Sequence, residues 1–169
     1  MKTKRGACFV VALAVGILLS ACSVPDAGDR PVTEGRDWHW DQEAGADEAS
    51  AFMDVAVPKE AAEVEGAVQV NPQEDVYFLS FVTGEKDAED IAETLHSEEP
   101  LRAHKAEAAP KAELFGHLGL AEPQTLKGTR WAGVCPPCVN DDHRKKVQWI
   151  EIHVQTLKSD RARVYLQAF

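Results

Sequence analysis

The chain has 169 residues, of which 28 are acidic and 18 are Lys or Arg, so its formal net charge at pH 7 is −10. This charge argues against binding to nucleic acid, which depends on cationic contacts to phosphates, and against lying flat on anionic lipid. The length suits one folded domain with one core.

The first residues predict a signal peptide. Lys2, Lys4 and Arg5 form a cationic region, and an apolar run of 13 residues follows at 7–19. A helix that crosses a bilayer needs about 20 apolar residues, so this run has the length of a secretory signal instead. We expect residues 1–21 to be removed. Because they carry three cations and no acidic residue, their removal changes the net charge from −10 to −13.

The signal ends in Leu19-Ser20-Ala21-Cys22, which resembles the lipobox of bacterial lipoproteins. The resemblance implies a diacylglyceryl group on Cys22, cleavage directly before it, and acylation of the new amine, as with palmitate. It therefore implies no cofactor other than this lipid, and a location at the extracytoplasmic face of the cell membrane, where two long acyl chains hold a protein durably. The alternative is an ordinary secretory signal followed by an incidental cysteine.

After Cys22, the chain predicts an acidic flexible tether that extends to residue 50. The stretch 22–50 is rich in Asp, Glu, Gly, Ala and Pro and has no sustained hydrophobic period, which is typical of a segment without a core of its own. Trp38 and Trp40 are exceptions in this polar stretch. They either form a docking patch for a partner or pack back on the folded domain.

Residues 51–169 predict a single domain, which begins with a short helical turn and two strands. Pro58 suits the first turn of a helix, and the apolar stretch at 67–70 predicts a short strand. The β-branched and aromatic residues of 75–83 predict a second, largely buried strand. We expect these two strands to pair as a hairpin.

Two helices are predicted in the middle of the domain. The first covers 85–96, because its apolar residues recur with the helical period and carboxylates crowd its first turns. The second is weaker, beginning near Pro110 and ending around Gly119. The apolar face of the first consists of Ala88, Ile91, Ala92 and Leu95.

The C-terminal residues predict an antiparallel hairpin with one core face. Apolar residues alternate with polar ones on both sides of a turn at 158–160, which is the period of a half-buried strand. The fold class that follows is α+β in two layers, an antiparallel sheet with the helices on one face, in the order β-β-α-α-β-β. The expected core face of the hairpin consists of Ile150, Ile152, Val154, Val164 and Leu166.

The lipobox, the acidic tether, the stretches "VPKEAAEVEG" and "DVYFLSF" and the terminal hairpin together resemble a group of small lipoproteins of actinobacteria. The similarity spans about residues 52–169. It implies a lipid-anchored extracytoplasmic domain and no particular activity.

The stretch "CPPC", with Cys135 and Cys138, has three interpretations. A structural disulfide is favoured, because an exported protein meets an oxidising environment. A thioredoxin-like redox centre also uses C-P-P-C. That fold, however, needs roughly twice the 31 residues that follow Cys138, and Val134 stands where Trp is usual.

The third interpretation is a zinc site formed with His143, since C-x2-C-x4-H is the spacing of a zinc knuckle. The position of the fourth knuckle ligand is Gln148, so Asp141, Asp142 or His153 would have to complete the site. We therefore expect no metal there.

The sequence favours a non-enzymatic role, because it contains no G-x-S-x-G, H-E-x-x-H or phosphate-binding loop motif. The expected function is a lipid-anchored domain that binds an unknown partner protein or envelope component. The alternative from another class is an envelope thiol-disulfide or metal-handling protein that uses the "CPPC" motif.

Overall fold

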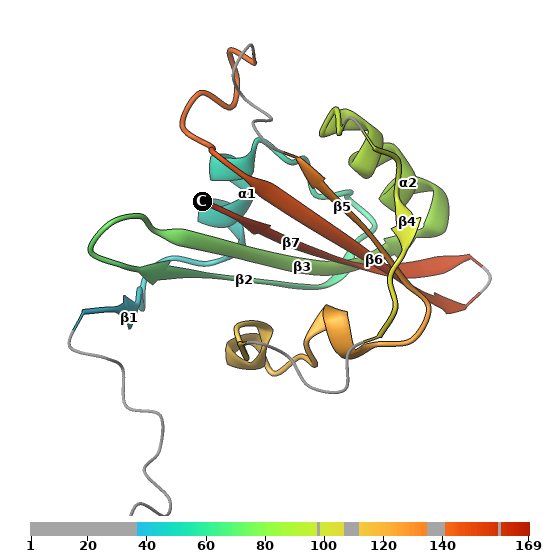
Figure 1. Cartoon of the computed structure of the whole chain (residues 1–169), viewed down its shortest axis with the longest axis horizontal. Coiled ribbons are helices and arrows are strands. Elements are labelled where there is room, and N and C mark those ends of the chain that lie inside the picture. Colours follow the sequence, from blue (N-terminus) through green and yellow to red (C-terminus); the bar gives the residue numbers. More distant parts are fainter. Residues whose placement is uncertain (1–36, 98, 107–111, 135–140, 159) are drawn as a thin grey trace, which may run out of the picture. The chain divides into compact units, whose positions relative to one another are not determined.

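The computed structural model describes residues 37–97, 99–106, 112–134, 141–158 and 160–169. In these residues a seven-stranded antiparallel sheet has the order β1-β2-β3-β7-β6-β5-β4 (Figure 1). The strands are β1 (His39–Trp40), β2 (Ala62–Val70), β3 (Val76–Gly84), β4 (Arg102–Ala103), β5 (Thr129–Val134), β6 (Ile150–Lys158) and β7 (Arg161–Ala168). The helices are α1 (Ala46–Met53), α2 (Glu85–Thr94) and two short 3-10 helices, η1 (Phe115–Leu118) and η2 (Pro123–Thr125).

The predicted C-terminal hairpin is β6 and β7, and β7 is the central strand of the sheet. Leu166 pairs with Ile152 of β6 on one side and with Leu79 of β3 on the other. The predicted core face is confirmed, because period-2 alternation directs successive side chains to opposite faces. Its residues Ile150, Ile152, Val154, Val164 and Leu166 are fully buried.

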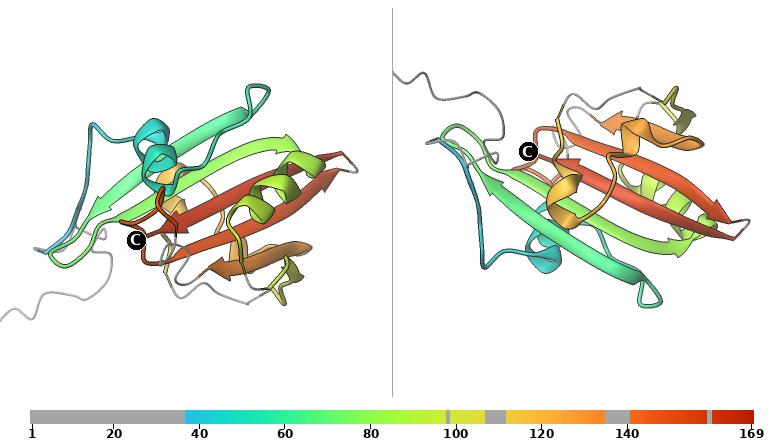
Figure 2. Two further views of the ribbon diagram at one scale, coloured as in Figure 1. Left: turned by 90° about the horizontal axis from the view of Figure 1, so that it is seen from above. Right: turned by 90° about the horizontal axis from the view of Figure 1, so that it is seen from below.

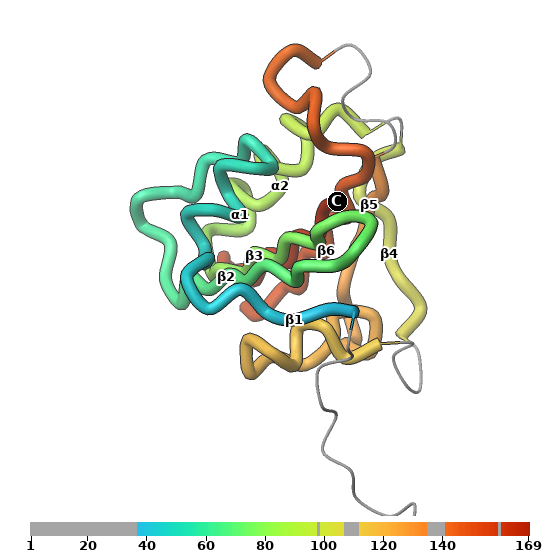
Figure 3. The backbone as a smooth tube through the Cα atoms, turned by 90° about the vertical axis from the view of Figure 1, so that its left-hand side faces the viewer, coloured from blue at the N-terminus to red at the C-terminus, as the bar shows by residue number. Residues whose placement is uncertain are grey.

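Both α-helices cover this apolar face (Figure 2, left; Figure 3). The predicted amphipathic helix is α2, whose Ala88 and Ile91 are buried against the sheet together with Leu95, which caps its C-terminal end. Helix α1 contributes Ala49 and Met53, which lie four residues apart on one helical face. The α+β class and the antiparallel sheet are thus as expected.

The opposite face of the sheet is covered by the segment that contains η1 and η2 (Figure 2, right). Phe115 of η1 packs edge-on against Phe78 of β3 and Tyr165 of β7, with ring centroids 5.5 and 5.2 Å away. The predicted second helix is the short 3-10 helix η1 and not an α-helix. It ends at Gly119 as expected, and its expected start near Pro110 lies outside the described residues. Gly116 is a poor helix former, and Gly119, at φ 70°, ends the turn after four residues.

The expected element order was also wrong in its N-terminal part. Pro58 is in a turn, since its carbonyl accepts the N–H of Ala61 at 2.9 Å, and β2 begins directly afterwards. The observed order of strands and α-helices is β-α-β-β-α-β-β-β-β, because strands β1, β4 and β5 and helix α1 were not expected and the expected second helix is a 3-10 helix.

The folded domain begins earlier than the expected boundary at residue 51. His39 pairs with Val70 and Trp40 with Gln69 of β2, and α1 starts at Ala46. The described residues before 51 are therefore part of the sheet and its helical layer and not a free tether. The physical reason is that Trp40, Ala49 and Met53 supply apolar surface that a local period did not reveal.

Candidate functional site

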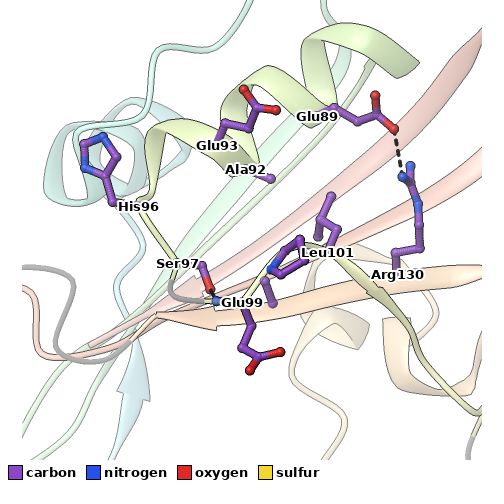
Figure 4. Close-up of a pocket in the computed structure, with 10 residues that line it drawn as sticks. Glu89, Ala92, Glu93, His96, Ser97, Glu99, Leu101 and Arg130 are labelled. Atoms are coloured by element: carbon purple, nitrogen blue, oxygen red, sulfur yellow. Dashed lines mark hydrogen bonds and ion pairs between the residues drawn. The ribbon is translucent and has the colours of Figure 1, made fainter.

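A pocket of about 590 Å³ lies between α2, the segment that follows α2, and β5 (Figure 4). We refer to it as the α2 pocket. The residues that line it come from 89–101 of this helix and segment and from the outer part of the sheet. They are Glu89, Ala92, Glu93, His96, Ser97, Glu99, Pro100, Leu101, Arg130 and Ala132.

The apolar part of the α2 pocket includes two small side chains, Ala92 and Ala132, beside Leu101. Ala92 follows the buried Ile91 on α2, and Ala132 of β5 is itself buried. Leu101 packs against the same core from the segment before β4. Because two of these side chains are methyl groups, the space between helix and strand stays open and apolar.

Arg130 joins β5 to α2 at one end of the pocket. Its guanidinium donates to Glu89 Oε1 at 2.8 Å and also to Glu85 Oε1, and Glu85 Oε1 accepts in addition from Thr156 Oγ1 of β6 at 3.1 Å. Arg130 and Glu85 are mostly buried. An arginine held by two carboxylates fixes the position of both elements.

The segment after α2 is fixed as well. His96 has φ 56°, the left-handed conformation that ends a helix, and its N–H donates to the carbonyl of Glu93 at 3.1 Å. Ser97 Oγ then donates to the carbonyl of Gly133 on β5 at 3.1 Å and accepts the N–H of Glu99 at 3.2 Å. Hydrogen bonds within the chain therefore hold the segment after α2 against β5.

The rim of the α2 pocket is acidic. Glu93 and Glu99 are exposed, as is part of Glu89. Arg130, which lines the pocket, is already engaged by Glu85 and Glu89. Glu99 pairs with the exposed Arg102 at 3.6 Å, so Glu93 is the rim carboxylate that makes no ion pair within the described residues. The pocket thus combines an apolar floor with a negative rim, and a negative rim attracts cationic groups.

The residues predicted to carry chemistry lie elsewhere or outside the described residues. Cys22, Cys135 and Cys138 are outside them, so the lipidation and disulfide expectations stay predictions. His143 is exposed, and its N–H donates to Asp141 Oδ1 at 2.9 Å. Among the described residues, no three His, Cys, Asp or Glu side chains gather as a metal-binding group.

Asp141, a candidate zinc ligand from sequence, has a structural partner. Its Oδ2 accepts from Arg144 Nη1 at 2.8 Å. Arg144 is only 6% exposed and donates further to the carbonyls of Met53 and Asp54 at the end of α1 and of Thr94 at the end of α2. This arginine was missed in the sequence, where it is one of three consecutive basic residues.

His153, a second candidate ligand, is buried at 3% exposure on the face that carries η1 and η2. Its Nε2 lies 2.9 Å from Glu151 Oε1, and the His104 ring is 6.1 Å away. The Nδ1 atoms of both histidines are buried and have no partner in the described structure. Buried polar atoms of this kind are commonly satisfied by internal water.

Trp38 and Trp40, the expected docking residues, occupy two different environments. The Trp40 ring stacks on His117 of η1 at 3.9 Å and packs against Phe78 at 5.6 Å, so it belongs to the second apolar cluster. Trp38 meets the edge of Trp40 at 6.2 Å and remains half-buried.

No known protein family matches this chain, and neither a curated protein nor a solved structure matches it significantly. Within the described residues, no helix has the length and apolar composition needed to cross a membrane.

Proposed function

We propose that the protein is a lipid-anchored extracytoplasmic binding domain, held to the cell membrane through Cys22, and that the α2 pocket is its ligand site. The lipobox-like end of the signal peptide supports the anchor. The observation that carries the ligand site is the pairing of a fixed apolar floor with an acidic rim in the α2 pocket.

The chemistry of the pocket supports a particular kind of ligand. Ala92, Leu101 and Ala132 offer contacts to a short aliphatic group, while the exposed Glu93 favours a positive charge at the mouth. A lysine-like group has both parts, because an ammonium sits at the end of an aliphatic stem. We therefore propose that the site receives such a group from an envelope partner.

Three polar residues of the pocket, Glu89, Ser97 and Arg130, hold its walls. Arg130 and Glu89 bind one another, and Ser97 binds the backbone of Gly133 and Glu99. A preformed wall lowers the ordering cost of binding. This supports a binding role for the pocket.

Two measurements on the full-length protein in its own membranes test this proposal. Intact-mass analysis should find a chain that begins at Cys22 and carries a diacylglyceryl-sized increment. Carbodiimide cross-linking, which joins a carboxylate to a nearby amine as an amide, should give a defined adduct that Glu93→Lys removes and Glu48→Lys retains. Both substitutions reverse the charge of an exposed glutamate on a helix, but only Glu93 lines the pocket. An unmodified N-terminus, or equal cross-linking of the two variants, would contradict it.

A further inference from the structure

A second pocket, of about 730 Å³, lies where the β2–β3 hairpin, the residues before β1 and the C-terminal residue meet. In Figure 1 β1 lies beside the turn end of this hairpin. We refer to it as the Trp38 pocket. It is distinct from the α2 pocket, since the two share no lining residue.

Two aromatic side chains, those of Trp38 and Phe169, line the Trp38 pocket. Trp38 is half-buried and abuts Trp40 at an interplanar angle of 86°, while Trp40 is held in the apolar cluster under η1. Phe169 is held by its backbone, whose N–H donates to the carbonyl of Trp149 and whose carbonyl accepts from Gln148 and Trp149. The pocket therefore combines an indole that packs on Trp40 with a phenyl ring on a backbone that is hydrogen-bonded in place.

Three carboxamides line the same pocket, namely Gln69, Asn71 and Gln73. Asn71 is oriented by Nδ2, which donates to the carbonyl of Gln69 at 2.9 Å, and by its N–H, which donates to Asp75 Oδ1 at 3.1 Å. Within the described residues, Asn71 Oδ1 and the Gln73 side chain make no hydrogen bond. Each carboxamide carries two donors and an acceptor, so donors and acceptors remain for a ligand.

We propose that the Trp38 pocket binds a neutral pyranose oligosaccharide. The less polar face of a pyranose presents C–H groups that pack on an indole or a phenyl ring. The indole also carries an N–H, which suits a site that is partly exposed to water. Each hydroxyl of the sugar can donate and accept a hydrogen bond, and the carboxamides of the pocket offer both acceptors and donors. Asp37 and Glu74, which also line the pocket, accept from hydroxyls and disfavour an anionic sugar. The inference rests on the proposed extracytoplasmic location, where envelope glycans are present.

Calorimetric titration of the full-length protein, purified in detergent, tests the proposal. The probes are chitotetraose, cellotetraose and the anionic tetragalacturonate. We expect saturable binding of at least one neutral tetrasaccharide and at least tenfold weaker binding of tetragalacturonate. Tighter binding of chitotetraose identifies an acetamido-sugar chain as the ligand, and tighter binding of cellotetraose identifies a plain glucan.

Single substitutions test whether oligosaccharide binding depends on the Trp38 pocket. Trp38→Ala should weaken binding at least tenfold, and Gln73→Ala, at an exposed turn position, should weaken it at least threefold. Trp131→Ala, the same truncation on β5 and outside the pocket, should leave it unchanged. Thermal melting of each variant verifies folding.

Two results would overturn the oligosaccharide site: no saturable binding of either neutral probe, or wild-type affinity in both Trp38→Ala and Gln73→Ala. Neither result depends on the lipid or on the α2 pocket, because the probes are added to purified protein. An unlipidated protein that still binds the oligosaccharide would contradict the proposed function and retain this site.

Discussion

The Nε of Arg144 donates a hydrogen bond to the main-chain carbonyl of Met53, 2.8 Å away and 91 positions earlier in the chain. The same guanidinium reaches the carbonyl of Asp54 at 3.2 Å and that of Thr94 at 3.3 Å. The last carbonyls of a helix have no partner within the helix and carry the negative end of its dipole. One buried cation therefore ties the ends of α1 and α2 to the segment that leads into β6.

The first prediction concerns this arginine. Arg144→Ala leaves helix-end carbonyls and the Asp141 carboxylate without their shared donor, and we expect it to lower the free energy of unfolding by about 3 to 5 kcal/mol. Lys145→Ala is the matched control. Its ion pair with Asp142 is exposed, so its loss should cost less than about 1 kcal/mol. Urea unfolding of the two variants gives both values, and similar costs would show that Arg144 does not join the helices.

The second prediction is a pH dependence at Asp141. The pKa of this carboxyl lies below its usual value of 3.8, chiefly because the backbone N–H of His143 donates to it; burial opposes this effect, and Arg144 adds to it through its charge and hydrogen bonds. A folded-state pKa below the unfolded one contributes stability that is fully present above the unfolded pKa. That stability is lost as the pH falls through the folded pKa.

Asp141→Asn should therefore destabilise the protein at pH 7, and the difference from wild type should shrink as the pH falls below about 3.8. Asp142→Asn removes an exposed neighbouring carboxylate and should change stability little at either pH. Denaturant unfolding at several pH values measures this. A destabilisation by Asp141→Asn that stays constant down to strongly acid pH would refute the assignment.

Local sequence periods predicted the parts of the fold that depend on one element. The alternation in β6 and β7 identified Ile152 and Val164 as core residues, because the position of a residue along a strand determines the face to which its side chain points. The same pattern assigned His153 and Tyr165 to a polar outer face, yet both are buried. The segment that covers them folds as 3-10 turns and has no sustained hydrophobic period, so the local sequence does not predict the apolar cluster on this face.

The α2 pocket was not predictable in the same way. The helical period placed Ala92 on the buried side of α2, but the opposing wall depends on β5 lying beside α2. Arg130 and Glu85 are far apart in the sequence, so the ion pair between them depends on the order of the strands in the sheet. Strand order is a property of the whole chain, which local periodicity does not encode.

The third prediction concerns a close approach between α1 and the sheet. A Cβ added at Gly66 of β2 would lie 2.5 Å from the Cα of Ala46, at the start of α1. Gly66→Ala must therefore displace backbone, and we expect a loss of about 1 to 3 kcal/mol in thermal or urea unfolding. Gly45→Ala places its methyl group in open space and should change stability by less than about 0.5 kcal/mol. Equal melting temperatures would contradict the packing of α1 on β2.

The last prediction tests the link between Arg130 and α2. Arg130→Met keeps the aliphatic stem but leaves Glu85, a mostly buried carboxylate whose Oε2 has no partner in the described structure, without its cation. We expect a cost of about 1 to 3 kcal/mol. Glu85→Gln added to Arg130→Met should recover part of it, because the double variant has no unpaired buried charge at this position.

The control for Arg130→Met is Arg102→Met on the neighbouring strand β4. Arg102 lies over the Trp131 ring at 4.8 Å and pairs with Glu99 in an exposed contact, so its replacement should cost less than about 1 kcal/mol. Urea unfolding of Arg130→Met, of Glu85→Gln and of the double variant measures the coupling between Arg130 and Glu85. Additive effects of Arg130→Met and Glu85→Gln would show that the two side chains act independently, and that the wall of the α2 pocket does not depend on their ion pair.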